Sequence, residues 1–116
     1  MNQNTRACIA YIAAKLISGS GGATVYDHSR SKYINISGTV AGSRINLYDH
    51  ERKSHVRGST ASFYDGDTGA HLLINIDGKR FSGRIHDSNC RYSGTVNGKS
   101  VTFYDYEESR HFNYTV

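Results

Sequence analysis

The most repeated chemical feature of this sequence is a tyrosine followed by an aspartate, with a second aromatic or imidazole ring several residues later. Rings can stack on the faces of sugars, and carboxylates can bind sugar hydroxyls, so an exposed belt of such groups suits a carbohydrate ligand. We expect the belt to bind a partner, with carbohydrate as the first ligand class. The candidate ligand-binding residues are Tyr26, Tyr33, Tyr48, His55, Tyr64, His71, Tyr104, His111, Asp49, Asp65 and Asp105.

The same repeat also has a purely structural interpretation. The rings would form the cross-strand pairs Tyr26 with Tyr33, Tyr48 with His55, Tyr64 with His71, and Tyr104 with His111. Each such pair stabilises a hairpin by roughly 0.2 to 1 kcal/mol. The aspartates, Asp27 included, can accept backbone N–H groups within the turns and so order them without any ligand. A fifth copy, His86-Asp87 leading to Arg91 and Tyr92, is degenerate.

Charge divides the two ends of the expected hairpins. The chain has 14 Lys and Arg against 10 Asp and Glu, a net charge of +4. Most acids follow the Tyr-Asp repeats, whereas a cluster of cations flanks the glycine turns. Those cations favour an alternative function, the binding of an anion or a nucleic acid. The candidate residues of this alternative are Arg44, Arg57, Lys79, Arg80 and Lys99.

Catalysis is a third alternative, in the form of a small hydrolase that uses a Tyr, His and Asp cluster. The sequence contains no nucleophile elbow and no metalloprotease motif, and an active site needs one distinct arrangement rather than a repeated unit. We therefore favour a non-enzymatic binding or assembly domain. His50 and His55 form the closest histidine pair, but turn histidines usually face solvent, and we expect no metal site and no cofactor.

The N-terminal residues predict a helix over 5–18. Thr5 is a candidate N-cap, Ile9, Ile12 and Leu16 recur at helical spacing, and Gly19 provides a stop. The helix is apolar nearly all round, which indicates that it packs against a sheet or a partner. Residues 19–23 form a Gly/Ser hinge, and residues 24–116 form the rest of a single domain that covers 1–116.

From residue 24 onward the hydrophobic period is two, and turn signals recur between apolar runs. Asp77-Gly78 and Asn97-Gly98 predict two-residue hairpin turns, with matching turns at 40–42 and 57–59. Residues 37–49 and 93–105 align without gaps, which indicates internal duplication. Ten strands are expected, near 23–27, 32–38, 42–49, 53–58, 60–66, 70–77, 79–87, 90–96, 99–106 and 109–115.

The predicted fold is mostly β, a ten-strand antiparallel meander closed as a barrel or a flattened sandwich, with the helix over one opening or edge. Alternation places an apolar set on the buried face and the tyrosines of the repeats, with His71 and His111, on the other. The predicted core is Ile34, Ile36, Ile45, Leu47, Phe63, Leu72, Ile74, Ile76, Ile85, Val101, Phe103 and Phe112.

Cellular context and partners follow from the remaining features. Cys8 and Cys90 lack metal-site spacing and are expected to be buried free thiols in a reducing cytoplasm. The apolar stretch Ala7 to Ala14 is too short to span a membrane, so no membrane partner is expected. The absence of proline leaves strand edges unprotected, and the side of the helix with Cys8 and Tyr11 offers a second surface, so we expect a homodimer.

Overall fold

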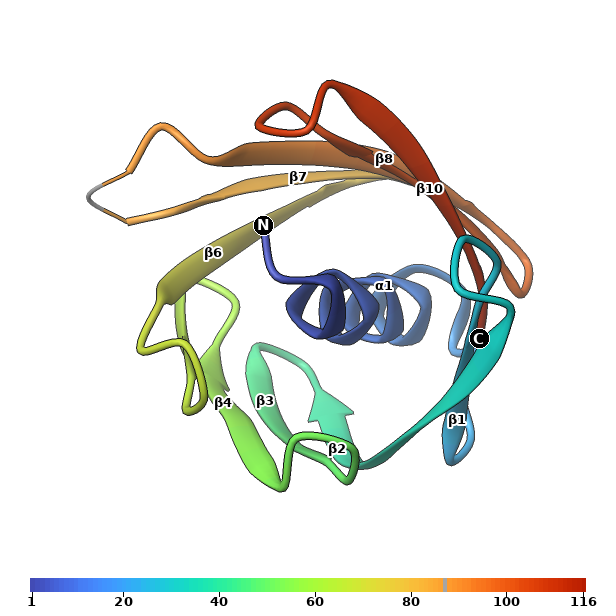
Figure 1. Cartoon of the computed structure of the whole chain (residues 1–116), viewed down its shortest axis with the longest axis horizontal. Helices are drawn as coiled ribbons and strands as arrows, with labels where there is room; N and C mark the ends of the chain where they lie inside the picture. The colour runs from blue at the N-terminus through green and yellow to red at the C-terminus, as the bar shows by residue number, and fades with distance from the viewer. Residues whose placement is uncertain (87) are drawn as a thin grey trace.

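The computed structural model describes residues 1–86 and 88–116 as one closed antiparallel barrel around a helix (Figure 1). The helix α1 spans Gln3–Ser18. The strands are β1 (Thr24–Asp27), β2 (Lys32–Ala41), β3 (Arg44–Asp49), β4 (Ser54–Ser59), β5 (Ser62–Asp65), β6 (His71–Asp77), β7 (Arg80–Ile85), β8 (Arg91–Asn97), β9 (Ser100–Asp105) and β10 (Arg110–Thr115). The predicted ten-strand meander is confirmed, and of the predicted closures it is the barrel that forms.

Each strand pairs with its neighbours in sequence, and β1 closes the barrel by pairing with β10. The Tyr-Asp turns and the glycine turns alternate along the chain, as predicted. The glycine hairpins have two-residue loops, but Asp77 pairs with Arg80 and Asn97 pairs with Ser100. The loops are therefore 78–79 and 98–99, one residue later than predicted, because Asp77 and Asn97 still belong to the strands. The turn predicted at 57–59 is wrong, since these residues end β4 and the loop is 60–61.

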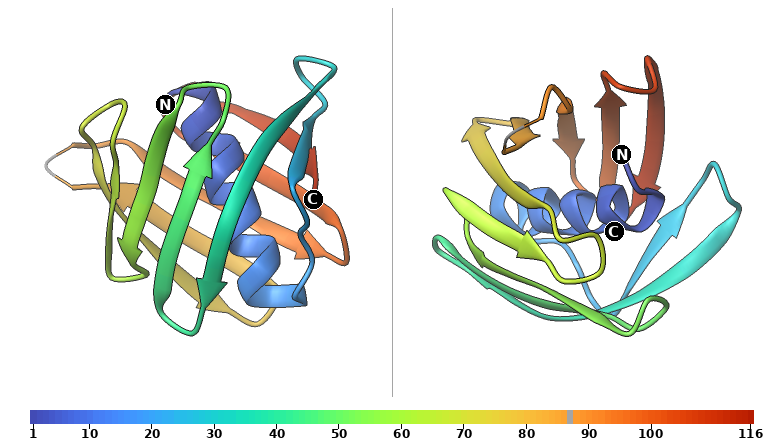
Figure 2. Two further views of the ribbon diagram at one scale, coloured as in Figure 1. Left: turned by 90° about the horizontal axis from the view of Figure 1, so that it is seen from below. Right: turned by 60° about the vertical axis from the view of Figure 1, so that its left-hand side comes forward.

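The helix runs through the interior of the barrel rather than over an opening or an edge (Figures 1 and 2). Its residues from Asn4 to Ala14 are all buried. A barrel of ten strands is wider than the eight-strand barrels that side chains alone can fill, so the helix supplies the missing core. The prediction of a covering helix is thus wrong, and its all-round apolar surface is explained by strands on every side.

The helix also begins earlier than predicted. Its N-cap is Asn2, whose side-chain oxygen accepts the N–H groups of Asn4 and Thr5 at 2.8 and 3.2 Å. Thr5 lies inside the first turn instead, and its hydroxyl points to the barrel wall. The stop at Gly19 is confirmed, since this residue adopts the left-handed conformation with φ of 69°.

The inward positions of the strands form the predicted core with two exceptions. Ile76 is 39% exposed, because it lies at the end of β6 beside the 78–79 turn, where inward packing partners run out. Ile85, at the end of β7, is only partly buried. Tyr92 and Tyr114, which the sequence analysis did not assign to the core, are both buried.

Two inward-facing glycines make room for the large rings in the core. A Cβ on Gly83 would lie 2.3 Å from the Tyr92 hydroxyl, and a Cβ on Gly94 would lie 2.5 Å from the Phe81 ring. Any side chain at these positions would displace a ring of the core. The wall formed by β7 and β8 is therefore thin at this point, with an aromatic ring directly behind the backbone.

The two segments that align in sequence form equivalent hairpins. In residues 37–49, Ser37 pairs with Tyr48, and in residues 93–105, Ser93 pairs with Tyr104. The register of the hairpin β2–β3 is thus the same as that of β8–β9. In the fifth, degenerate Tyr-Asp copy, Asp87 lies outside the described residues.

Candidate functional site

The four predicted ring pairs all form on the outer face of the barrel. Tyr26 with Tyr33, Tyr48 with His55, Tyr64 with His71, and Tyr104 with His111 are direct cross-strand partners. Their ring centroids lie 4.7 to 4.8 Å apart. Ring edges face ring surfaces in most of these pairs, which is the preferred arrangement of neighbouring aromatic groups.

Three of these pairs are extended by a third ring that the sequence analysis did not use. His28, His50 and Tyr106 each lie two residues after a repeat tyrosine and contact its ring at 4.7 to 4.8 Å. The signal was present in the alternation of the preceding strand, which puts these rings on the face of the repeat tyrosine when it is continued one residue past the strand end. Each central tyrosine thereby contacts two further rings, as Tyr104 contacts Tyr106 and His111.

Four repeat aspartates lie on the opposite, inner face and are fully buried: Asp27, Asp49, Asp65 and Asp105. In each of these four copies one carboxylate oxygen accepts two backbone N–H groups of the following turn. For Asp65 these donors are Asp67 and Thr68, at 3.0 and 3.3 Å. The turn-ordering role expected for Asp27, Asp49, Asp65 and Asp105 is confirmed.

The second carboxylate oxygen of three aspartates binds the start of the helix. Asn4 donates to Asp49 at 3.0 Å, Thr5 to Asp65 at 2.5 Å, and Arg6 to Asp105 at 3.1 Å. Consecutive helical residues point about 100° apart, so three adjacent side chains reach three separate points of the surrounding wall. The buried carboxylates also lie at the positive end of the helix dipole, which favours their charge.

Two arginines complete this inner network. Arg30 Nε lies 2.7 Å from Asp27, and Arg52 lies 2.6 Å from Asp49 and 2.9 Å from Asp65. Burial alone would raise the pKa of Asp27, but hydrogen bonds from Arg30 and Ser29 outweigh it and hold the pKa below its ordinary value. Arg52 therefore joins the turns that follow Asp49 and Asp65, and Arg30 keeps the carboxylate of Asp27 ionised.

The inner location of the aspartates changes the candidate site. Asp49, Asp65 and Asp105 are fully covered and engaged within the protein, whereas the rings of the same repeats point outward. In the four copies whose aspartate the structure describes, the sheet separates the carboxylates from the rings, so these copies do not assemble a Tyr, His and Asp cluster of the kind a hydrolase would need. The inward position could have been inferred, since Asp65 shares the parity of the core residue Phe63.

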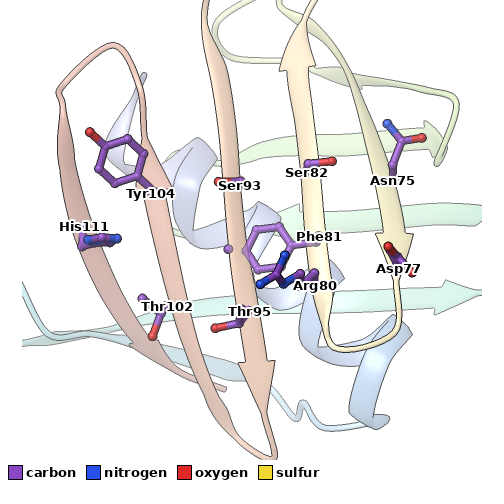
Figure 3. A pocket seen from close by; sticks show the side chains of 11 residues that line it. Asn75, Asp77, Arg80, Phe81, Ser82, Ser93, Thr95, Thr102, Tyr104 and His111 are labelled. Carbon is purple, nitrogen blue, oxygen red and sulfur yellow. The ribbon is translucent and has the colours of Figure 1, made fainter.

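A groove of about 470 Å³ lies on the outer face over β6 to β10 (Figure 3). One row of cross-strand neighbours runs through it, and the register gives this row as Asn75, Ser82, Ser93, Tyr104 and His111. The next row includes Asp77, Arg80, Thr95 and Thr102. The groove is therefore a polar floor with an aromatic wall at one side.

The groove exists because small side chains stand between larger ones. Ser82 and Ser93 are the central pair of the row, between the amide of Asn75 on one side and the ring of Tyr104 on the other. Below them the wall is thin, and the buried ring of Phe81 also lines the groove beside Gly94. The short serine side chains leave open the space that larger residues would fill.

Only part of the predicted belt contributes to this groove. Tyr104 and His111 line it, while the other repeat rings lie on the outer face elsewhere around the barrel. The sequence analysis missed Asn75, Ser82, Ser93 and Thr95. The alternation pattern already placed all four on the outer face, but the alignment of Asn75, Ser82 and Ser93 into one row depends on the register of β6, β7 and β8, which only the structure shows.

The cations of the alternative site lie near the glycine turns and are exposed, as predicted. Arg44, Arg57, Lys79, Arg80 and Lys99 come from four different hairpins. Only Arg80 among them lines the groove. The structure thus distributes these charges around one end of the barrel and does not gather them into one concave patch in the described part of the chain.

The two cysteines are free, in agreement with the prediction, but only Cys8 is fully buried. Burial raises the pKa of the Cys8 thiol to about 12. Cys90 is half buried, and its thiol donates to Glu107 at 2.8 Å. The buried position of Cys8 and Tyr11 removes the helix surface proposed for a dimer, and barrel closure removes the strand edges proposed for it.

Comparisons with protein-family models, with curated proteins and with solved structures found no match to this chain. Among the described residues, no helix has both the length and the apolar character needed to cross a membrane. The function must therefore be argued from the groove, the rings and the charges themselves.

Proposed function

We propose that this chain is a non-enzymatic carbohydrate-binding domain whose site is the outer groove beside Tyr104. One observation carries the proposal. A tyrosine in contact with two further rings lies beside a floor of hydroxyl side chains, in a concavity of about 470 Å³. Small-molecule sites commonly have volumes of about 300 to 1,000 Å³.

The aromatic wall supports stacking against the apolar face of a sugar ring. Tyr104 is half buried, and the ring centroids of Tyr106 and His111 both lie 4.7 Å from its own. A tyrosine offers a large, rigid contact surface with few rotatable bonds, so little conformational entropy is lost on binding. Because its neighbours already restrict the Tyr104 ring, this cost is lower still.

The floor supports hydrogen bonding to sugar hydroxyls, which both donate and accept. Ser82, Ser93 and Thr95 carry hydroxyls with the same dual capacity, and Asn75 adds an amide that donates through nitrogen and accepts through oxygen. Asp77 adds an acceptor at the edge. A ligand rich in hydroxyls can satisfy these groups from one side of its ring while its other face meets Tyr104.

The number of carboxylates in the groove favours binding of a saccharide over its hydrolysis. Most glycosidases place two carboxyl groups on either side of the scissile bond. Of the residues described as lining this groove, Asp77 is the single carboxylate. The buried aspartates of the Tyr-Asp turns lie behind the sheet and do not supply a second one.

A glycan array followed by calorimetry tests the proposal. Tyr104→Ala is expected to weaken binding of any saccharide that the wild type binds by about tenfold or more, which corresponds to about 1.4 kcal/mol. The matched control is Tyr48→Ala. Tyr48 is held by His50 and His55 in the same way but lines neither this groove nor the neighbouring one described below.

Two results would contradict the proposal. No binding by the wild type to any saccharide on the array would refute the proposal. Equal loss of affinity in the Tyr104 and Tyr48 variants, with both folded, would show that the groove is not the site.

A further inference from the structure

We propose that the saccharide bound by this domain is acidic and that Arg84 and Arg91 recognise its carboxylate. This inference rests on the proposed function, because it assigns the charge of the ligand for the same surface. It is carried by a second groove, of about 450 Å³, that adjoins the first. Asn75, Ser82 and Ser93 line both grooves, so the two form one continuous trough.

Two arginines lie side by side in the second groove. Arg84 on β7 and Arg91 on β8 are direct cross-strand partners, both are exposed, and both line the groove. Like charges directly opposite one another destabilise a sheet. Within residues 1–86 and 88–116, no carboxylate lies within salt-bridge distance of either guanidinium. A bound carboxylate would relieve this repulsion.

The chemistry of the pair matches a planar anion. A guanidinium presents parallel N–H donors that bind a carboxylate in a bidentate manner, and charge-assisted hydrogen bonds of this kind are stronger than neutral ones. Both side chains are exposed, so water and salt screen the interaction. The arginines are therefore expected to select among saccharides, while Tyr104 and the polar floor provide affinity that is independent of charge.

The spacing links the arginines to the aromatic wall. Ser93 is the cross-strand neighbour of Tyr104, and Arg91 lies two residues along the same strand from Ser93, roughly 7 Å away. The Arg91 guanidinium also lies 5.4 Å from the centre of the Tyr106 ring, whose other neighbour is Tyr104. A sugar ring stacked on Tyr104 thus has a cation about one sugar unit away along the trough.

The experiment compares one oligosaccharide in two charge states. The probes are an oligomer of galacturonic acid and the same oligomer with its carboxylates methyl-esterified, each titrated calorimetrically into the folded wild-type protein at low salt. We expect the acid to bind at least about tenfold more tightly than the ester. The double variant Arg84→Gln with Arg91→Gln should bind the acid as weakly as the ester and should bind the ester like the wild type.

Two further variants separate the inference from the proposed function. Tyr104→Ala should weaken binding of both probes, and the control Arg57→Gln, which removes an exposed cation outside both grooves, should change neither. Equal binding of acid and ester by the wild type, abolished by Tyr104→Ala, would overturn the acidic ligand and leave the proposed function standing.

The remaining outcomes count against one claim or both. Binding of the acid that survives Tyr104→Ala but not the double arginine variant would indicate capture of an anion without stacking, and would overturn the proposed function. If Arg57→Gln weakened binding of the acid as much as the double arginine variant does, the overall positive charge of the protein, and not the arginine pair, would be what attracts the acid. Binding of neither probe would overturn the acidic ligand, and the glycan array would then decide the proposed function.

Discussion

Replacing Arg52 with methionine is expected to destabilise the protein strongly without touching the outer groove. The Arg52 side chain is 9% exposed, and it lies 2.6 Å from Asp49 and 2.9 Å from Asp65, two carboxylates with no exposure. Burial alone would lower the pKa of this guanidinium, but Asp49 and Asp65 raise it above its ordinary value, so Arg52 remains charged. Methionine would leave both carboxylates buried without their counter-ion.

The size of the effect follows from that loss. Removing one partner of a buried ion pair costs about 3 to 5 kcal/mol. Asp49 keeps its bond from Asn4, and Asp65 keeps its bond from Thr5, so we expect the lower limit, about 3 kcal/mol. For a domain of this length such a loss lowers the melting temperature by about 10 to 15 °C.

Urea unfolding at neutral pH, followed by circular dichroism, measures this difference. The control is Arg57→Met, an exposed position on β4, for which the free energy of unfolding should change by no more than about 0.5 kcal/mol. Adding Asp49→Asn and Asp65→Asn to the Arg52 variant should restore part of the stability, because the unpaired charges are then gone. An Arg52 variant within about 1 kcal/mol of wild type would refute this reasoning.

Three other predictions concern single groups. Hydrogen bonds from Arg30 outweigh the effect of burial and hold the folded-state pKa of Asp27 below its ordinary value. The charge of Asp27 therefore stabilises the fold above the unfolded-state pKa of about 3.9, and this stabilisation is lost as pH falls through the folded-state pKa. Arg30→Gln should accordingly flatten the fall of the melting temperature below about pH 4. Cys8, whose pKa burial raises to about 12, should resist a thiol reagent in the native protein, so that Cys90→Ser leaves no rapidly reacting thiol until urea is added. Tyr92→Phe removes a hydrogen bond of 2.6 Å from the buried hydroxyl to the β6 backbone and should lower the free energy of unfolding by about 1 kcal/mol, read from the urea midpoint.

Local features of the chain were predictable because they depend on neighbours in the sequence. The Tyr-Asp and glycine turns mark the ends of the strands, and alternation between them assigns each residue to a face. From these two facts follow the ring pairs, such as Tyr48 with His55, and the burial of residues such as Leu47 and Phe103. Strand bounds shifted by a few residues at several ends, where a turn residue still belongs to the pairing.

The role of the repeat aspartates was only half predictable. Their bonds to the following turn are local, and the sequence analysis anticipated them. Their bonds to Asn4, Thr5 and Arg6 join residues between 45 and 99 positions apart. The polar start of an otherwise apolar helix was a visible signal, but no local rule says that this start lies within a ring of turns.

What the sequence by itself determined is therefore the order of strands and turns and the face on which each side chain lies. The tertiary structure decided three further things: the closure of β1 on β10, the insertion of the helix into the barrel, and the trough beside Tyr104. Each of these depends on the register and curvature of many strands together, because a lumen or a groove is a space between elements. Periodicity along one strand carries no information about such a space.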